Sequence, residues 1–166
     1  MKKSFILFIL LTAMLFTAGC TEKTQENSTS PQIIQGKSDV IEATQLGQIN
    51  ESLQKGPVLL KLGAEWCGPC QEMKPTLKEL AAEYGGRVTV MSVDIDQSPK
   101  LADYFEVIVV PDSFVIVGIE NGEYVYMQED GNLSKDRFKA RILKLKDKEL
   151  FERVLDFALQ KKVKAK

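Results

Sequence analysis

The chain has 166 residues, of which 44% are hydrophobic and 27% are charged, a composition that fits one globular domain with additional segments. Its formal net charge of -1 gives no indication of a nucleic-acid partner, and none is expected. The chain has no histidine, which excludes histidine catalysis and histidine metal ligands, and its three cysteines are too few for a disulfide scaffold.

The N-terminal 19 residues have the layout of a secretory signal. A positively charged start precedes an apolar run over residues 5–16, which is too short to cross a bilayer comfortably as a permanent helix. The small residues that follow end at Cys20, and residues 17–20 resemble the lipobox of lipoproteins except at Thr17, where leucine is commoner. The resemblance implies cleavage before Cys20 and a lipid on its thiol, and therefore an exported protein anchored to the extracytoplasmic face of the cell membrane. The alternative is an ordinary signal peptide followed by a chance cysteine.

Residues 21–38 are polar and rich in Ser, Thr, Gln and Asn, so they cannot bury enough apolar surface to fold. We expect a flexible linker with a mean span of roughly 20–25 Å, long enough to lift a small domain off a membrane. The predicted organisation is a lipoprotein-type signal peptide over 1–19, a lipidated cysteine and linker over 20–38, a folded domain over 39–146 and a helical extension over 147–166.

The first half of the predicted domain alternates strands with helices. A short strand at Val40-Ile41 precedes a helix that carries Leu46, Ile49 and Leu53 at helical spacing and ends at Gly56-Pro57. The elements that follow are a buried strand over 58–62, a helix over 68–84, a strand over 87–94 and a helix over 98–105. Because such an alternation needs crossover connections, it predicts a parallel sheet with helices on both faces.

The second half predicts an antiparallel hairpin. Residues 107–110 are extended up to Pro111, and strands over 113–119 and 123–128 flank a turn at Asn121-Gly122. The predicted fold class is therefore α/β, with a central mixed sheet.

Two helices are expected after Gly131. In the first, Ser134 is the N-cap, and Phe138, Ile142 and Leu145 lie on one face. The second is an extra C-terminal helix that we expect to pack against the domain as an appendage. Its apolar stripe consists of Leu150, Val154, Leu155 and Ala158.

The motif Cys67-Gly68-Pro69-Cys70 follows a buried strand and opens a helix. Unpaired N–H groups and the helix dipole favour a thiolate at such a position, and a spacing of two residues lets the sulfurs form a disulfide with little backbone motion. Half of a zinc site is one alternative, but the other ligands are missing, so no metal is expected. A structural disulfide is the other, but a loop this short adds little stability.

The stretch Trp66-Cys67-Gly68-Pro69-Cys70 resembles the active site of the thioredoxin family, and the resemblance extends over about Val40 to Leu145. It implies a thioredoxin fold that works without a cofactor and reduces disulfides of substrate proteins. Cys67 would attack the substrate disulfide, and Cys70 would then resolve the mixed disulfide and form the Cys67–Cys70 bond. The other matching features are Pro75, at the family's helix kink, segment 94–99, Val110-Pro111, Asn121-Gly122-Glu123 and Gly131.

The resemblance also implies a substrate-binding surface. Pro111 would be a cis-proline beside the sulfurs, and the backbone of Val110 would pair with the substrate chain like an added strand. Trp66, Gly68 and Pro69 would complete this surface, although Trp66 also fits a core aromatic. A monomer with a membrane thiol transporter as electron donor is expected. Alternative functions are an oxidase or isomerase of exported proteins and a non-catalytic peptide-binding module.

Lys61 departs from the family's pattern. In thioredoxins, the place six residues before the first cysteine holds a buried aspartate that helps to move the proton of the second cysteine. Ser92 stands where the family has a lysine, and Asp112 stands where threonine commonly follows the cis-proline. A lone buried ammonium would cost several kcal/mol or lose its proton, so Lys61 needs a partner.

Our hypothesis is that Lys61 faces Asp112 across adjacent strands beneath Cys70 and tunes the cysteine pKa values. The cation would favour thiolates and thus raise the reduction potential. In the alternative, Lys61 extends to the sheet edge and Asp112 bonds to nearby backbone.

The C-terminal region is rich in lysine and arginine. A surface that rests on anionic lipid and a solvated helix face with interleaved charges are both compatible with this composition. The basic residues are Lys139, Arg141, Lys144, Lys146, Lys148, Lys161, Lys162, Lys164 and Lys166.

Overall fold

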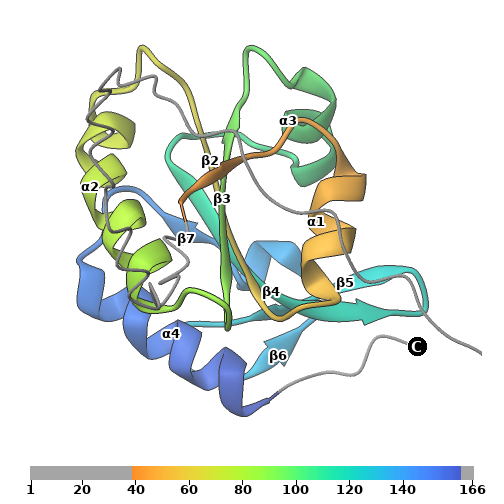
Figure 1. The fold of residues 1–166 in the computed structure, drawn as a ribbon. Coiled ribbons are helices and arrows are strands. Elements are labelled where there is room, and N and C mark those ends of the chain that lie inside the picture. The colour runs from red at the N-terminus through yellow and green to blue at the C-terminus, as the bar shows by residue number, and fades with distance from the viewer. Residues whose placement is uncertain (1–38, 162–166) are drawn as a thin grey trace, which may run out of the picture. The chain divides into compact units, whose positions relative to one another are not determined.

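The computed structural model describes residues 39–161, so the predicted signal peptide, Cys20 and the linker lie outside the described residues (Figure 1). The helices are α1 (Leu46–Leu53), α2 (Gly68–Glu83), α3 (Pro99–Phe105), the short 3-10 helix η1 (Arg137–Lys139) and α4 (Lys148–Gln160). The strands are β1 (Ile41–Glu42), β2 (Val58–Gly63), β3 (Thr89–Asp94), β4 (Asp112–Glu120), β5 (Glu123–Met127), β6 (Leu133–Ser134) and β7 (Ile142–Leu143). Among residues 39–161, none of the helices has the length and apolar character to cross a membrane.

The strands form one mixed sheet in the order β1-β3-β2-β4-β5-β6, and β7 pairs with β4. The neighbours β1, β3 and β2 are parallel, whereas β4 runs antiparallel to β2 and to β5. At the β4–β5 turn, Asn121 and Gly122 have positive φ angles of 55° and 81°, which match the twist of the flanking strands in a two-residue hairpin. The predicted mixed α/β sheet is thus confirmed.

Helices cover both faces of this sheet, with α2 and α4 on one face and α1 and α3 on the other (Figure 1). Side chains along β2 alternate between the two faces, since Leu59 packs in the cluster with α2 and α4 while Leu60 and Leu62 pack in the cluster with α1 and α3. This alternation places Lys61 and Gly63 on the α2 side of β2.

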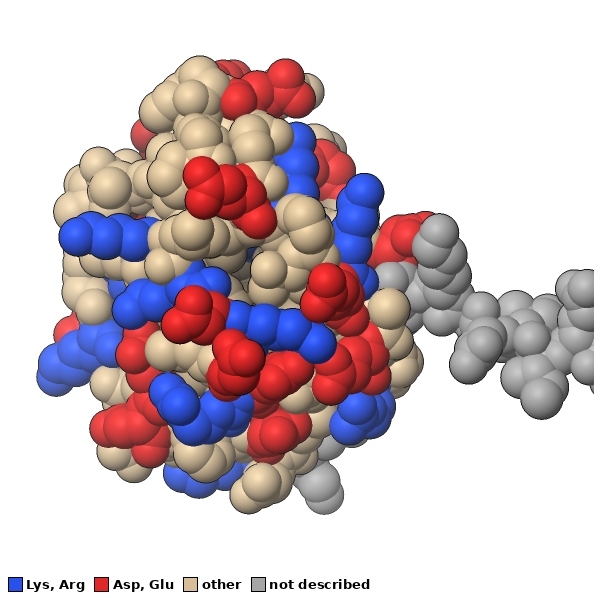
Figure 2. Space-filling view, turned by 90° about the vertical axis from the view of Figure 1, so that its left-hand side faces the viewer, with Lys and Arg blue, Asp and Glu red and all other residues tan. Residues whose placement is uncertain are grey.

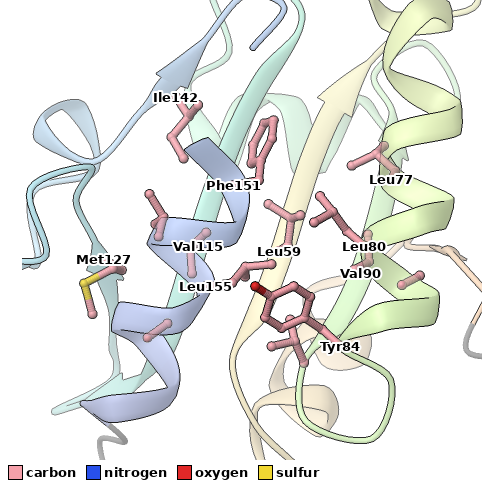
Figure 3. Close-up of a cluster of buried hydrophobic side chains, with 14 of the residues drawn as sticks. Leu59, Leu77, Leu80, Tyr84, Val90, Val115, Met127, Ile142, Phe151 and Leu155 are labelled. Carbon is pink, nitrogen blue, oxygen red and sulfur yellow. The ribbon is translucent and has the colours of Figure 1, made fainter. Parts of the chain in front are cut away.

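Helix α4 is an integral part of the core, so the expectation that it packs as an appendage to the domain is wrong. Figure 3 shows Phe151 and Leu155 of α4 directed toward Leu59 and Val115 of the sheet, with Leu77 and Leu80 of α2 beside them. Phe151 and Leu155 are fully buried. The apolar stripe of α4 therefore completes one of the two hydrophobic layers.

The expected helix after Gly131 is also wrong, because this segment forms β6, η1 and β7 instead. Ser134 lies in β6 rather than at a helix N-cap, and the carboxylate of Asp136 accepts the N–H of Phe138 at 3.0 Å to begin η1. Ile142 is fully buried whereas Phe138 is 56% exposed, so the two do not lie on one apolar helix face. Pairing of β7 with the first residues of β4, which β5 leaves unpaired, replaces the hydrogen bonds that a helix would have made.

Candidate active site

Cys67 and Cys70 form a disulfide at the start of α2, directly after the loop that follows β2. Their Cα atoms are 5.2 Å apart. Cys67 is the N-cap residue, and its Sγ accepts the backbone N–H of Cys70 at 3.2 Å. Cys67 is 5% exposed and Cys70 is fully buried, so Cys67 is the sulfur nearer to solvent.

The start of α2 is suited to hold Cys67 as a thiolate. The N–H of Cys70 in the first helical turn donates to the sulfur, and the helix dipole adds positive potential there. Pro69 fits this turn because its fixed φ angle matches the helix and its missing N–H would have had no partner. The arrangement allows one sulfur to act as a nucleophile and the other to capture it as a disulfide.

A cis peptide bond joins Val110 to Pro111 next to the sulfurs, as the family resemblance implies. Val110 and Ile95 pack against the small cluster of Ala64, Cys67 and Cys70. Pro111 is buried, and its carbonyl oxygen accepts the N–H of Lys144 at 3.0 Å. Among the described residues, no backbone hydrogen bond uses the N–H or C=O of Val110. An extended chain could therefore pair with Val110 beside Cys67.

An apolar groove of about 340 Å³ lies beside the disulfide. Its lining consists of Trp66, Ile95, Val107, Ile108, Val109 and Val110. Trp66 is 69% exposed, and its Nε1–H donates to the Asp96 carboxylate at 2.8 Å. Trp66 is thus a surface side chain held at the groove, and the alternative of a core aromatic is wrong.

The predicted pair of Lys61 and Asp112 is wrong. The β2–β4 register places Lys61 opposite Ser113 and places Leu62 opposite Asp112. Because opposite residues project from the same face and successive residues from opposite faces, Lys61 lies on the α2 side and Asp112 on the α1 and α3 side. The sheet itself separates the two groups.

Asp112 instead pairs with Arg141, a residue that sequence reasoning had assigned only to the basic C-terminal region. The Asp112 carboxylate is fully buried, and its Oδ2 lies 3.4 Å from Nη1 of Arg141. Burial raises the pKa of Asp112 to about 6, although the Arg141 cation and the N–H of Ser113 act in the opposite direction. No motif in the sequence connects these two residues, since they meet only because β7 pairs with β4.

Lys61 lies beside Cys70. A Cβ atom on Gly63 would lie 2.3 Å from Nζ of Lys61 and 2.8 Å from Sγ of Cys70, so the ammonium and the sulfur flank the same small space. Burial lowers the pKa of Lys61, while the carboxylates of Glu42 and Asp94 raise it. Glu42 is a further site residue that sequence reasoning missed, because it belongs to the two-residue edge strand β1.

The charges on the α2 and α4 side are mixed. Figure 2 shows acidic and basic side chains interleaved on this face. Lys148 at the start of α4 lies near three carboxylates, those of Glu79, Glu83 and Glu152. The side chain of Arg141 is buried in its ion pair with Asp112 and does not contribute to the surface charge. Lys162, Lys164 and Lys166 lie outside the described residues.

In the part of the chain that the structure describes, no cluster of three cysteine or acidic side chains is arranged to hold a metal ion. The functional groups at this site are the two cysteine sulfurs, one ammonium and carboxylates, which suit proton and sulfur chemistry.

Comparisons with known proteins all point to the same family. Residues 39–144 match the family model described as Thioredoxin. A thioredoxin from Staphylococcus haemolyticus is 37% identical over 76 residues, which cover 46% of this chain and 70% of the relative. Thioredoxin 1 from Chlorobaculum tepidum is 42% identical over 62 residues, covering 37% of this chain and 61% of the relative.

Solved structures show the same fold. Mitochondrial thioredoxin 3 from Saccharomyces cerevisiae, in its oxidised form, superimposes with a TM-score of 0.51 at 21% identity, covering 70% of this chain and 93% of that chain. A mutant thioredoxin from Halobacterium salinarum gives a TM-score of 0.54 at 21% identity, covering 78% of this chain and 96% of that chain.

Proposed function

This chain is a member of the thioredoxin family, and we propose that it reduces disulfide bonds of exported proteins while a lipid on Cys20 anchors it to the membrane. Thiol–disulfide exchange at a disulfide-capable cysteine pair is the activity common to the family. What we propose beyond this shared activity is the direction of exchange, the substrates and the location.

The observation that carries the proposal is the position of the Cys67–Cys70 pair at the start of α2, beside an open apolar groove and the free backbone of Val110. A substrate segment in the groove would bring its disulfide to the sulfur of Cys67, and backbone pairing with Val110 would hold the segment extended. Both contacts use features common to most peptides, which suits an enzyme that acts on many substrate proteins.

The reaction runs through two exchanges. The Cys67 thiolate attacks one sulfur of the substrate disulfide, the substrate S–S bond breaks, and the other substrate sulfur leaves as a thiolate. Cys70 then loses its proton and attacks the Cys67 sulfur, which releases the second substrate thiolate. The products are a dithiol substrate and the Cys67–Cys70 disulfide. A membrane thiol donor is the proposed source of the two electrons that return the pair to its reduced state.

A specific observation favours oxidation as a second candidate direction. The Lys61 cation beside Cys70 stabilises a thiolate and therefore the reduced pair, which makes the disulfide a stronger oxidant. The Gly-Pro sequence between the cysteines resembles that of reducing members of the family, and we place more weight on it because it borders both sulfurs.

The test is reduction of insulin disulfides by the purified chain with dithiothreitol as electron donor. We expect insulin to precipitate faster than with dithiothreitol alone, and Cys67→Ser to remove the acceleration completely. The matched variant Cys70→Ser keeps the nucleophile but lacks the resolving thiol, so it should accumulate a Cys67–insulin mixed disulfide. Acceleration that persists in Cys67→Ser would contradict the proposal.

The proposed anchor is tested separately in cells that express the full chain. We expect the parent to incorporate labelled fatty acid and to sediment with membranes. Cys20→Ser should lose both properties and retain insulin reduction, because Cys20 precedes the described domain. Equal labelling of parent and variant would refute lipidation at Cys20.

A further inference from the structure

One row of side chains crosses the three parallel strands beneath the disulfide. Glu42 of β1 and Lys61 of β2 both pair with Ser92 of β3, which stands between them. Paired residues of neighbouring strands project from the same face, so all three lie on the α2 side of the sheet, the side that carries Cys70. A lysine that is only 4% exposed on a central strand thus has a carboxylate in its own row, two strands away.

The absent side chain of Gly63 brings the ammonium of Lys61 to the sulfur of Cys70. The position that a Cβ would occupy lies 2.3 Å from Nζ and 2.8 Å from Sγ, so the two atoms are separated by no more than the sum of these distances. Any larger residue at position 63 would push one of them away. Within this range an opposite charge lowers the pKa of an acid by roughly one to three units.

The charged end of Lys61 reaches a polar pocket of about 100 Å³. Glu42 and Asp94 lie at this pocket, and the carboxylate of Glu42 accepts the backbone N–H of Asp94 at 2.9 Å. Burial raises the pKa of Glu42, while this hydrogen bond and the Lys61 cation act in the opposite direction and favour the carboxylate. Lys61 and Gly63, which border the sulfur of Cys70, both line this pocket.

We propose that Lys61 stabilises the thiolate of Cys70 during the resolving step and that Glu42 is the positioning residue that holds Lys61 as a cation. The proposal rests on the proposed function and deepens it. The thiol of Cys70 loses its proton to solvent at the pocket, and its electron pair then forms the Cys70–Cys67 bond. The Cys67–substrate bond breaks, and the substrate sulfur leaves as a thiolate.

Of the two lysines at this site, Lys61 is the one beside the sulfur. The other charged groups around Lys61 and Cys70 are Glu42 from β1, Asp94 from β3, Lys74 from α2 and Glu65 from the loop before α2. The uncharged polar groups are Ser92 from β3, Ser113 from β4 and Gln71 from α2. Lys74 is exposed, whereas Lys61 is buried beside the sulfur, so solvent screens Lys74 far more strongly.

The test is the titration of Cys70 by ultraviolet absorbance of its thiolate, in a full chain that carries Cys67→Ser and Cys20→Ser so that Cys70 is the remaining thiol. Lys61→Met removes the charge and keeps an unbranched side chain of similar length. We expect it to raise the pKa of Cys70 by roughly one to three units. Lys74→Met is the matched control, and it should shift the titration by much less.

An unchanged or lower pKa of Cys70 in Lys61→Met would overturn the proposal, as would an equal shift in Lys74→Met. If Lys61→Met does not fold, Gly63→Ala displaces the ammonium without removing it and should also raise the pKa of Cys70. The failure of the proposed function is recognised separately, because the parent pair would then not reduce insulin at all. If the parent reduces insulin and Lys61→Met titrates like it, only this inference is lost.

The role of Glu42 is tested by a double-mutant cycle on the free energy of unfolding. Glu42→Gln should destabilise the parent more than it destabilises Lys61→Met, because only the parent leaves a buried ammonium without its carboxylate. Equal losses in the two backgrounds would refute the assignment of Glu42.

Discussion

Asp112 is a buried acid directly after the cis-proline, on the face of the sheet opposite to that of Lys61. Its carboxylate is fully buried, and among the described residues neither of its oxygens accepts a side-chain hydrogen bond. The Arg141 cation lies 3.4 Å away but does not fully offset the loss of solvation, so the pKa of Asp112 is raised to about 6. The protonated form of this residue is therefore favoured by folding.

Asp112 makes stability fall as the pH rises between about 4 and 6. In this range the unfolded chain has released a proton that folded Asp112 still binds, since its pKa rises from 3.8 to about 6 on folding. We expect the parent to lose about 3 kcal/mol relative to Asp112→Asn across this window, with no further change outside it. Urea unfolding of both proteins at several pH values measures the difference. A constant difference, or one that changes in the opposite direction, would contradict the account.

Among single residues, the sequence predicted the roles of those that lie in a recognisable short motif. Cys67 and Cys70 belong to a short motif at the start of a helix, and the cis bond at Pro111 was implied by the resemblance to the thioredoxin family. Burial of Lys61 was predictable because its strand is otherwise apolar. The residues that surround Lys61 could not be predicted, because the β2–β4 register depends on contacts that are distant in sequence. A shift of this register by one residue moves a side chain to the other face of the sheet.

Strand β7 braces the loop that carries the cis-proline. It pairs with the first residues of β4, and Lys144 donates its N–H to the carbonyl of Pro111. Arg141, just before β7, binds Asp112 and also donates to the backbone carbonyls of Phe105 and Glu106 at 2.8 and 2.6 Å. One side chain thus connects the end of α3, the start of β4 and the segment after β6.

Removal of Arg141 should therefore be costly. Arg141→Met leaves the Asp112 carboxylate buried without its cation, and we expect the free energy of unfolding at pH 7 to fall by about 3–5 kcal/mol. Adding Asp112→Asn should recover part of this loss. The control is Lys139→Met, an exposed neighbour, which should change stability by about 0.5 kcal/mol or less. A loss in Arg141→Met no larger than in the control would refute the stabilising role of Arg141.

Most elements were predictable from their periodicity and their ends, as in α2, which begins at Gly68 and contains Pro75 without a break. The segment after Gly131 was not. The spacing of Phe138, Ile142 and Leu145 fits a helix, but the first residues of β4 extend beyond β5 and offer backbone partners to this segment. Tertiary pairing thus overrides the helical pattern. The packing of α4 into the core was missed for a related reason, because the amphipathic stripe does not identify its partner.

For the described domain as a whole, the direction of the parallel strands brings the site together. Strands β1, β2 and β3 end at Glu42, Gly63 and Asp94, and parallel strands end at the same edge of a sheet. The cysteine loop follows β2 at this edge, so the disulfide and the Glu42–Lys61 row meet there.

The most direct test of the account is the redox titration of the Cys67–Cys70 pair. The purified chain is equilibrated with mixtures of reduced and oxidised dithiothreitol or glutathione, its free thiols are then alkylated, and the fraction reduced is read from the change in mass. We expect one reversible two-electron transition at this pair, with a potential that falls in Lys61→Met, and no transition in Cys67→Ser. A pair that stays oxidised or stays reduced in every mixture, while the chain remains folded, would contradict it.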